Sequence, residues 1–180
     1  MQGWRIFSVD ANSVLTETPL RHYYGEPETG AVVRYSTVEC VARCEVKVEH
    51  RSPHWYCNCG LYFVDRFAEA SGCCSLCMYP VAGPRVYAQV ESGSLVLPDL
   101  YLYRRLGYLV AFLWPHQSLR AAELRITELW VPGPDHCAAC APRTPKLSDE
   151  ILAALSERYA VPVRRLAPHG GTAVPSPDLT

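Results

Sequence analysis

The chain has no long hydrophobic run, and its sequence therefore gives no candidate for a membrane-spanning helix. Its longest apolar stretch, residues 106–114, has nine residues, whereas a transmembrane helix needs about 20. The first twenty residues contain Arg5, Asp10 and Glu17 and no extended apolar segment, so they do not have the pattern of a secretory signal peptide. We therefore expect a soluble, cytoplasmic protein.

An excess of charge of either sign is also lacking. The 17 Lys and Arg residues nearly balance the 18 Asp and Glu residues, so no overall field attracts nucleic acid or an anionic membrane. The 180 residues are 49% hydrophobic, and a chain of this length buries roughly 70% of its unfolded surface. We predict one domain over residues 1–166. Residues 167–180 contain three prolines and two adjacent glycines, which predicts a flexible tail.

Common catalytic signatures are missing from the sequence as well. It contains no glycine-rich phosphate loop, no HExxH motif and no nucleophile elbow, each of which places reactive groups at a defined spacing. Acidic residues such as Asp65, Glu69 and Glu91 stand alone. These absences favour a binding protein over an enzyme.

Cysteine, in contrast, is abundant. Nine cysteines in a chain without a secretory signal indicate metal binding rather than a disulfide framework, because the cytosol keeps thiols reduced. The densest group is Cys44, His50, Cys57 and Cys59, three thiols and one imidazole within sixteen residues. Zn²⁺ prefers four tetrahedral N and S ligands, and a site with four protein ligands is normally structural. We predict that these four residues bind zinc.

A second zinc site is predicted from two CxxC-type pairs that stand about sixty residues apart: Cys74 with Cys77, and Cys137 with Cys140. Two alternatives stay open, because buried thiols also pack as small hydrophobic groups and the adjacent Cys73 and Cys74 are compatible with a redox element. His54 and His136 lie beside the two groups. Either histidine is an alternative ligand.

A resemblance to a family rests on these cysteines and their neighbours. The pattern comprises Gly3-Trp4-Arg5, Ala42-x-Cys44, His50-x2-Pro53-x3-Cys57-x-Cys59-Gly60-Leu61-Tyr62 and Arg120-Ala121-x-Glu123. It resembles a group of small uncharacterised actinobacterial and actinophage proteins that share an H-x-A-P-x3-C-x-C-G-I-Y-A core followed by a G-Y-R-A-E segment. Ser52 and Phe63 replace the two alanines of that core, and Gly107-Tyr108 stands apart from Arg120-Ala121. The resemblance covers about residues 3–130 and implies a metal-bearing domain without assigned catalytic residues.

The local patterns predict an α+β domain stapled by zinc, with short antiparallel strands before one or two helices. Ser148 is an N-cap candidate for a helix over residues 148–160, with acids in its first turn and Ile151, Leu152, Leu155 and Tyr159 in one stripe. Ser118 similarly predicts a helix over residues 119–129, with a strand at 125–131 as the alternative. The run 61–64 is compatible with a strand or with the start of a helix that extends through Ala70, and we favour a helix or mixed segment. Residues 86–97 resemble a hairpin.

The predicted function is a zinc-stabilised binding module that recognises a protein partner, for example a phage or host regulatory factor. The first alternative is nucleic-acid binding, because cations contact phosphates and aromatic rings stack on bases. Its candidate residues are Tyr103, Arg104, Arg105, Arg164 and Arg165. The second alternative is a thiol-dependent redox enzyme that uses Cys73, Cys74 or Cys77.

Overall fold

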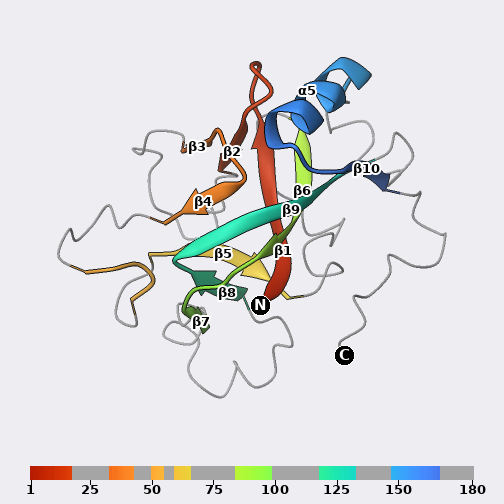
Figure 1. Ribbon diagram of the computed structural model, residues 1–180. Helices are drawn as coiled ribbons and strands as arrows, with labels where there is room; N and C mark the ends of the chain where they lie inside the picture. Colours follow the sequence, from red (N-terminus) through yellow and green to blue (C-terminus); the bar gives the residue numbers. More distant parts are fainter. Residues whose placement is uncertain are drawn as a thin grey trace.

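The computed structural model describes residues 1–17, 33–42, 50–54, 59–65, 84–98, 118–132 and 147–166, and these ranges contain ten strands and one helix (Figure 1). The strands are β1 (Gln2–Val9), β2 (Leu15–Glu17), β3 (Arg34–Tyr35), β4 (Glu39–Val41), β5 (Leu61–Val64), β6 (Arg85–Glu91), β7 (Val96–Pro98), β8 (Ser118–Ala121), β9 (Glu123–Pro132) and β10 (Val163–Leu166). The helix is α5 (Asp149–Tyr159).

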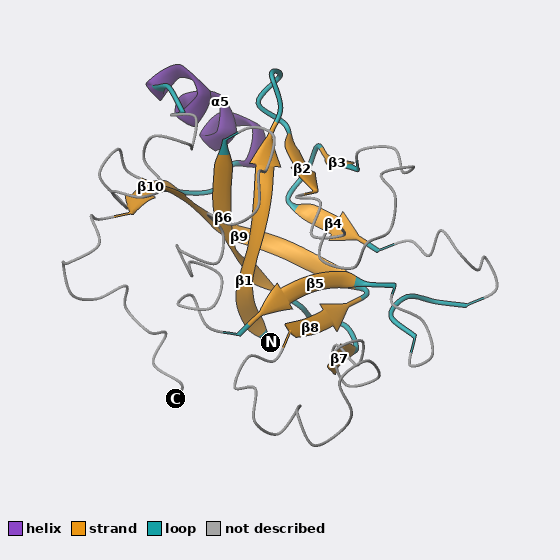
Figure 2. Cartoon of the chain, turned by 180° about the vertical axis from the view of Figure 1, so that it is seen from behind, coloured by secondary structure: helices purple, strands orange, loops and turns teal. Residues whose placement is uncertain are grey.

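All ten strands belong to one sheet, in which the main order is β10-β9-β6-β1-β5-β8-β7. Every pairing is antiparallel except that of β10 with β9. Strand β1 pairs with β6 along one edge and with both β2 and β5 along the other. Helix α5 lies at one end of the molecule, and β5, β8 and β7 lie at the opposite end (Figure 2).

A β-bulge keeps both halves of β9 turned toward the core. Val90 pairs with Ile126 and Gln89 pairs with Glu128, so Thr127 is an extra residue on β9, and its hydroxyl donates to the Gln89 carbonyl at 3.2 Å. An extra residue reverses the alternation of side chains between the two faces. The buried positions accordingly change from the even-numbered Leu124 and Ile126 to the odd-numbered Leu129 and Val131.

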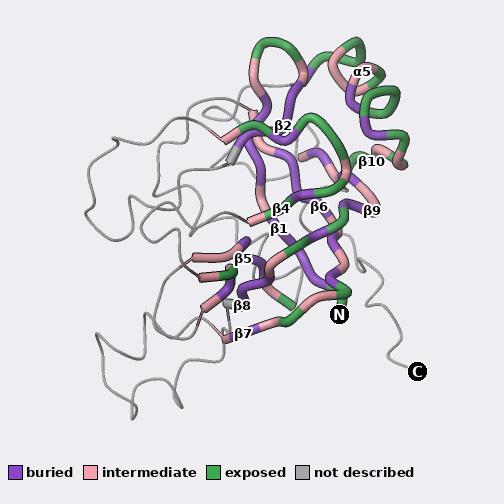
Figure 3. Tube along the Cα trace, turned by 60° about the vertical axis from the view of Figure 1, so that its left-hand side comes forward, coloured by how far each residue is buried: buried purple, intermediate pink, exposed green. Residues whose placement is uncertain are grey.

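The main hydrophobic core extends across the sheet from β5 and β8 to α5. It combines buried side chains from β1, β2, β3, β4, β5, β6, β8 and β9 with Leu155 and Tyr159 of the helix. Figure 3 shows β1 and β6 running through the interior while much of α5 faces solvent. A smaller cluster of Trp4, Tyr87 and Leu166 is separate from this core, and the Trp4 ring meets Trp130 edge to face at 6.3 Å.

Gly3 allows β5 to cross close to β1. A Cβ atom on this residue would lie 2.4 Å from Cδ2 of Phe63 and 2.6 Å from the Val64 carbonyl oxygen, both inside van der Waals contact. Trp4 pairs with Val64 at the same crossing. The absence of a side chain at Gly3 therefore sets where β5, and the segment that precedes it, meets the sheet.

The predicted fold class, an α+β domain with one or two helices stapled by zinc, is wrong. The described residues form a mostly antiparallel sheet with a single helix, and they contain no group of three or more His, Cys, Asp or Glu side chains able to hold a metal. A continuous hydrophobic core holds this sheet together.

Two predicted helices are strands instead. Residues 118–121 form β8 and 123–132 form β9, so the helix after Ser118 is wrong and the alternative strand at 125–131 is confirmed. Side chains of a strand alternate between the two faces of the sheet, and the turn at Ala122 and the bulge at Thr127 each shift this alternation. The apolar residues of the segment therefore have a spacing that matches a helix. Residues 61–64 form β5, because their alternate side chains, Leu61 and Phe63, enter the core.

The helix predicted over 148–160 is confirmed as α5. The Ser148 hydroxyl caps it by accepting from the Ile151 amide at 3.4 Å, and Ala160 ends it in a left-handed conformation. Residues 85–91 and 96–98 are both strands, but β6 pairs with β1 and β9 whereas β7 pairs with β8. The predicted hairpin between them is therefore wrong.

Among the described residues, no helix has the length and apolar character needed to cross a bilayer. The apolar stretch 106–114 and the predicted tail 167–180 lie outside the described ranges, so the predicted division into a domain and a tail after residue 166 stays a prediction.

Candidate metal centre

Two of the predicted zinc ligands, His50 and Cys59, lie next to each other at the end of the molecule opposite α5. Cys59 stands two residues before β5, and His50 begins the short described segment 50–54. The His50 Nε2 atom is 3.2 Å from the Cys59 Sγ atom, and both side chains are half-buried. The ring of His54 lies 4.5 Å from that of His50, between centroids.

The separation of His50 and Cys59 is close to that of two ligands on one zinc ion. Bond lengths of about 2.0–2.1 Å to nitrogen and 2.3 Å to sulfur, at a tetrahedral angle, place the two ligand atoms about 3.6 Å apart. The observed 3.2 Å is slightly shorter and is also a hydrogen-bond distance. The pair therefore needs only a small outward movement to accept a metal, and an imidazole with a thiolate is a donor set that zinc favours.

A buried arginine holds Cys59 against the sheet. The Nη1 atom of Arg120 donates to the Cys59 carbonyl at 3.0 Å, and its Nη2 atom donates to the Pro98 carbonyl at 3.4 Å. In β8, Arg120 stands opposite Tyr62 of β5 and Leu97 of β7. It therefore connects the residue before β5 with the end of β7.

Gly60 allows the 50–54 segment to approach β8. Its φ of +132° is unfavourable for residues with a side chain. A Cβ atom here would lie 3.0 Å from the Cβ of Arg120 and 3.2 Å from the Cβ of Pro53. The buried Pro53, which follows a cis peptide bond, therefore packs near Gly60 where a Cβ atom would lie, and so does Arg120.

Both ends of the segment between residues 42 and 61 attach to one turn. The Ala42 amide donates to the Ala122 carbonyl at 2.8 Å, and Leu61 pairs with Ala121. Ala42 and Leu61, the described residues at the two ends of this segment, therefore lie beside the same turn between β8 and β9.

The other predicted ligands and most of the predicted nucleic-acid contacts lie outside the described residues: Cys44, Cys57, Cys74, Cys77, Cys137, Cys140, Tyr103, Arg104 and Arg105. Cys73 and His136 also lie there. Of the first cysteine group, the structure therefore brings together His50 and Cys59, with His54 beside them. The predicted second zinc site and the predicted redox thiols stay predictions.

The predicted basic pair on β10 is neutralised by acids. Arg164 forms an ion pair with Glu128, and its guanidinium lies over the Trp130 ring at 5.6 Å. Arg165 forms an ion pair with Asp149 at the start of α5. Phosphate binding needs cations whose charge is available, so these pairings disfavour β10 as a nucleic-acid contact.

Sequence reasoning did not identify the two buried arginines near this end of the molecule. Arg5 is 5% exposed and Arg120 is 1% exposed. Arg5 donates to the Tyr62 carbonyl at 2.7 Å, and its guanidinium lies 5.2 Å from the Phe7 ring centroid. The period of a strand was the available signal, since Arg5 shares the inward face of β1 with Phe7 and Val9.

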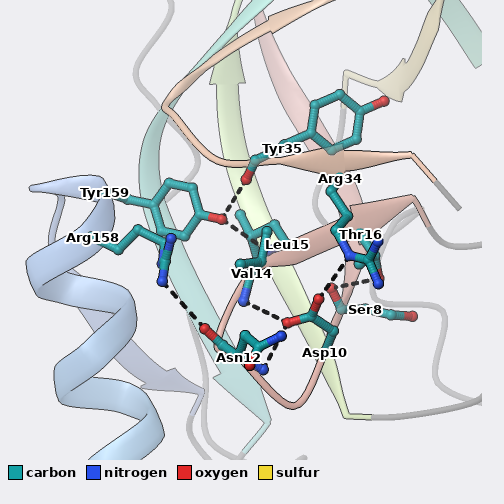
Figure 4. Close-up of polar contacts among 10 residues, drawn as sticks. All are labelled: Ser8, Asp10, Asn12, Val14, Leu15, Thr16, Arg34, Tyr35, Arg158 and Tyr159. Carbon is teal, nitrogen blue, oxygen red and sulfur yellow. Dashed lines mark hydrogen bonds and ion pairs between the residues drawn. The ribbon is translucent and has the colours of Figure 1, made fainter.

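The opposite end of the molecule contains a buried phenol that joins α5 to two strands through neutral hydrogen bonds (Figure 4). The Tyr159 hydroxyl donates to the Tyr35 carbonyl at 2.5 Å and accepts from the Leu15 amide at 2.8 Å. Burial raises the pKa of Tyr159 above its ordinary 10.0, although the Leu15 amide opposes this change. The phenol therefore stays protonated and pins α5 to β2 and β3.

Asp10 organises the β1–β2 turn beside this helix. Its carboxylate accepts from the Asn12 amide at 2.9 Å, the Val14 amide at 3.0 Å and the Arg34 Nε atom at 3.0 Å. Partial burial raises the pKa of Asp10, but the hydrogen bonds from Val14, Arg34 and Asn12 together outweigh it and lower the pKa below 3.8. These contacts are those of a turn, and the His50–Cys59 pair lies elsewhere.

The fold and the site together define a mostly antiparallel β-sheet protein with a histidine–cysteine pair at one end. Comparison with protein-family models, curated proteins and solved structures gave no match. The resemblance to the actinobacterial and actinophage proteins therefore stays a prediction.

Proposed function

We propose that this protein is a zinc-binding recognition module that binds a protein partner. In this proposal zinc is held by Cys44, His50, Cys57 and Cys59 and fixes the segment that carries them. The contact between His50 and Cys59 at 3.2 Å is the observation that carries the proposal. The metal acts locally, because the sheet has a hydrophobic core of its own.

Exposed apolar side chains at the same end of the sheet support a protein as the partner. Among the described residues, the exposed large hydrophobics are Met1, Val41 and Leu95, at 57%, 58% and 61%. The Met1 amino group donates to the Ser92 carbonyl, close in sequence to Leu95. Val41 stands opposite Glu123, whose amide donates to the Ser94 hydroxyl. Apolar groups gathered in one region favour protein contacts, whereas single ones are ordinary.

The ligand set also favours recognition over catalysis. Catalytic zinc keeps an open position for water or substrate beside three protein ligands. Three thiolates and one imidazole leave no such position. The zinc proposed here therefore orders a surface and activates no water.

Elemental analysis of the purified native protein tests the metal. We expect His50→Ala and Cys59→Ser each to lose one equivalent of zinc relative to the parent protein. Cys40→Ala is the matched control, because Cys40 is a buried thiol opposite Leu124 in the core, and it should keep the parent zinc content. Equal zinc content in all four proteins would remove the first site.

The partner is tested with surface variants at the same end. Proteins that co-purify with the native chain should be lost with Val41→Asp, Leu95→Asp and Cys59→Ser, and retained by Glu157→Arg on the exposed face of α5. Binding of nucleic acid instead, weakening steeply with salt, would replace this proposal by the first alternative.

A further inference from the structure

The metal-loop end of the molecule, which comprises residues 50–54, residues 59–65 and β8, contains a buried arginine, Arg120. Arg120 is the largest fully buried side chain among the described residues, with 1% of its surface exposed. Its neighbours in β8, Leu119 and Ala121, belong to the hydrophobic core. Full burial of an arginine is rare and costly unless hydrogen bonds satisfy it.

The Arg120 guanidinium bonds to two backbone carbonyls on different strands or loops. One belongs to Cys59, at 3.0 Å, and the other to Pro98 at the end of β7, at 3.4 Å. The planar fork of an arginine can hold two acceptors in fixed directions, which the single ammonium of a lysine cannot. Arg120 therefore fixes the Cys59 carbonyl relative to β7.

Fixing this carbonyl also restricts the thiol. The carbonyl carbon and the Cβ atom of Cys59 share one Cα atom, so the direction of the carbonyl limits where Sγ can lie. Gly60, which follows, has Cβ atoms of both Arg120 and Pro53 close to the position where its own Cβ would lie, and Pro53 belongs to the segment that carries His50. Arg120 thus holds the Cys59 carbonyl and packs near Gly60, beside the arrangement that places Sγ 3.2 Å from the His50 Nε2 atom.

We propose that Arg120 is a positioning residue of the metal site, which holds Cys59 in ligand geometry through its backbone carbonyl. This inference rests on the proposed zinc site. The residue does not touch the metal. Groups that orient metal ligands in this indirect way commonly change affinity by about 10–100-fold when they are removed.

Arg5 provides a matched comparison. It is also buried, at 5% exposure, and its Nη1 atom also donates to a backbone carbonyl, that of Tyr62. Its acceptor is a residue within β5, however, and its guanidinium lies over the Phe7 ring. Removal of either arginine removes a buried cation, but of the contacts described for the two, the one to the carbonyl of a proposed ligand belongs to Arg120.

Cobalt titration of the full chain tests the inference, because Co²⁺ replaces zinc and its visible absorption reports tetrahedral geometry and thiolate ligation. The proteins are the native chain, Arg120→Met, Arg120→Lys and Arg5→Met, each checked for folding by circular dichroism. We expect Arg120→Met and Arg120→Lys to weaken Co²⁺ binding by about 10–100-fold and to alter the absorption bands. Arg5→Met should keep the native affinity and bands, even where it unfolds at lower temperature.

The outcomes separate this inference from the function on which it rests. Native cobalt affinity and native bands in both Arg120 variants would overturn the inference and leave the zinc site intact. If Arg120→Met does not fold, Arg120→Lys decides by the same criterion, since it keeps the charge and loses the fork. Equal weakening in Arg5→Met and the Arg120 variants would show a general packing effect and would also overturn it. Failure of the native chain to bind Co²⁺ would overturn the proposed function itself, and the inference with it.

Discussion

The α5 end and the metal-loop end of the sheet each contain a buried polar side chain that hydrogen-bonds to backbone groups distant in sequence. At the α5 end this is the Tyr159 hydroxyl, which bonds to Leu15 and Tyr35. At the metal-loop end it is the Arg120 guanidinium, which bonds to Cys59 and Pro98. The first group is neutral and the second is charged.

This difference shows how the two ends divide stability and function. A buried phenol that both donates and accepts a hydrogen bond costs little, whereas a buried cation loses far more hydration. The α5 end thus contributes a stable junction between helix and sheet. The metal-loop end keeps the buried Arg120, whose burial costs free energy, beside the contact of His50 with Cys59. Such a costly residue is expected in a region that is arranged to bind a ligand.

Substitution of Gly60 should have the largest effect and should affect only the metal-loop end. In Gly60→Ala the left-handed backbone and the close Arg120 and Pro53 contacts should together cost about 3 kcal/mol of unfolding free energy. Zinc content should fall as well, because the 50–54 segment can no longer pack in place. Urea unfolding and elemental analysis measure the two effects.

Gly93→Ala is the control for this change, because nothing lies within 4 Å of a Cβ atom there. It should leave both stability and zinc content unchanged. Similar behaviour of the two glycine variants would mean that the packing around Gly60 does not shape the site.

Removal of the Tyr159 hydroxyl should destabilise the protein without affecting the metal. Tyr159→Phe leaves the Leu15 amide and the Tyr35 carbonyl without the phenol oxygen in a buried place, at an expected cost of about 1–3 kcal/mol. Urea unfolding gives the free energy, and cobalt titration gives the metal affinity. A loss of metal affinity in this variant would show that the two ends are coupled, and would contradict the separate roles of the α5 end and the metal-loop end.

The smallest expected effect is the acid sensitivity of the turn beside α5. The lowered pKa of Asp10 means that its contribution to stability is complete above the unfolded pKa of about 3.9. It is lost as the pH falls through the folded pKa, because the unfolded state binds the proton first. The difference in unfolding free energy between the native protein and Asp10→Asn should therefore shrink from about pH 5 to about pH 2. A difference that stays constant over this range would contradict the proposed hydrogen-bonded carboxylate.

The parts of the structure that sequence predicted are those set by local signals. Helix α5 was predictable because Ser148, the acids after it and the stripe ending at Tyr159 lie within a dozen residues. Strands β8 and β9 were mistaken for a helix because Ala122 and Thr127 interrupt their alternation, and such irregularities depend on the paired strands. The burial of Arg120 was equally hidden, since it depends on Tyr62 and Leu97, which are distant in sequence.

The candidate site divides in the same way. The closeness of His50 and Cys59 agrees with their spacing in the sequence, because the ligands of the predicted zinc site would converge on a single point. The zinc site itself stays a proposal. The residues that support them, Gly60 and Arg120, carry no ligand atoms, and only the folded chain shows what they contact. Positioning groups of this kind become visible when the paired strands are known.

X-ray absorption spectroscopy at the zinc edge of the purified native protein tests the central claim most directly. The account predicts bound zinc with sulfur neighbours near 2.3 Å and a histidine nitrogen near 2.0–2.1 Å, and a decrease in both the zinc content and the sulfur signal in Cys59→Ser. If both cysteine groups bind zinc, the zinc that Cys59→Ser loses should be the zinc with the histidine neighbour. Zinc that shows only oxygen neighbours, or a spectrum and zinc content that Cys59→Ser leaves unchanged, would contradict a metal centre built on His50 and Cys59.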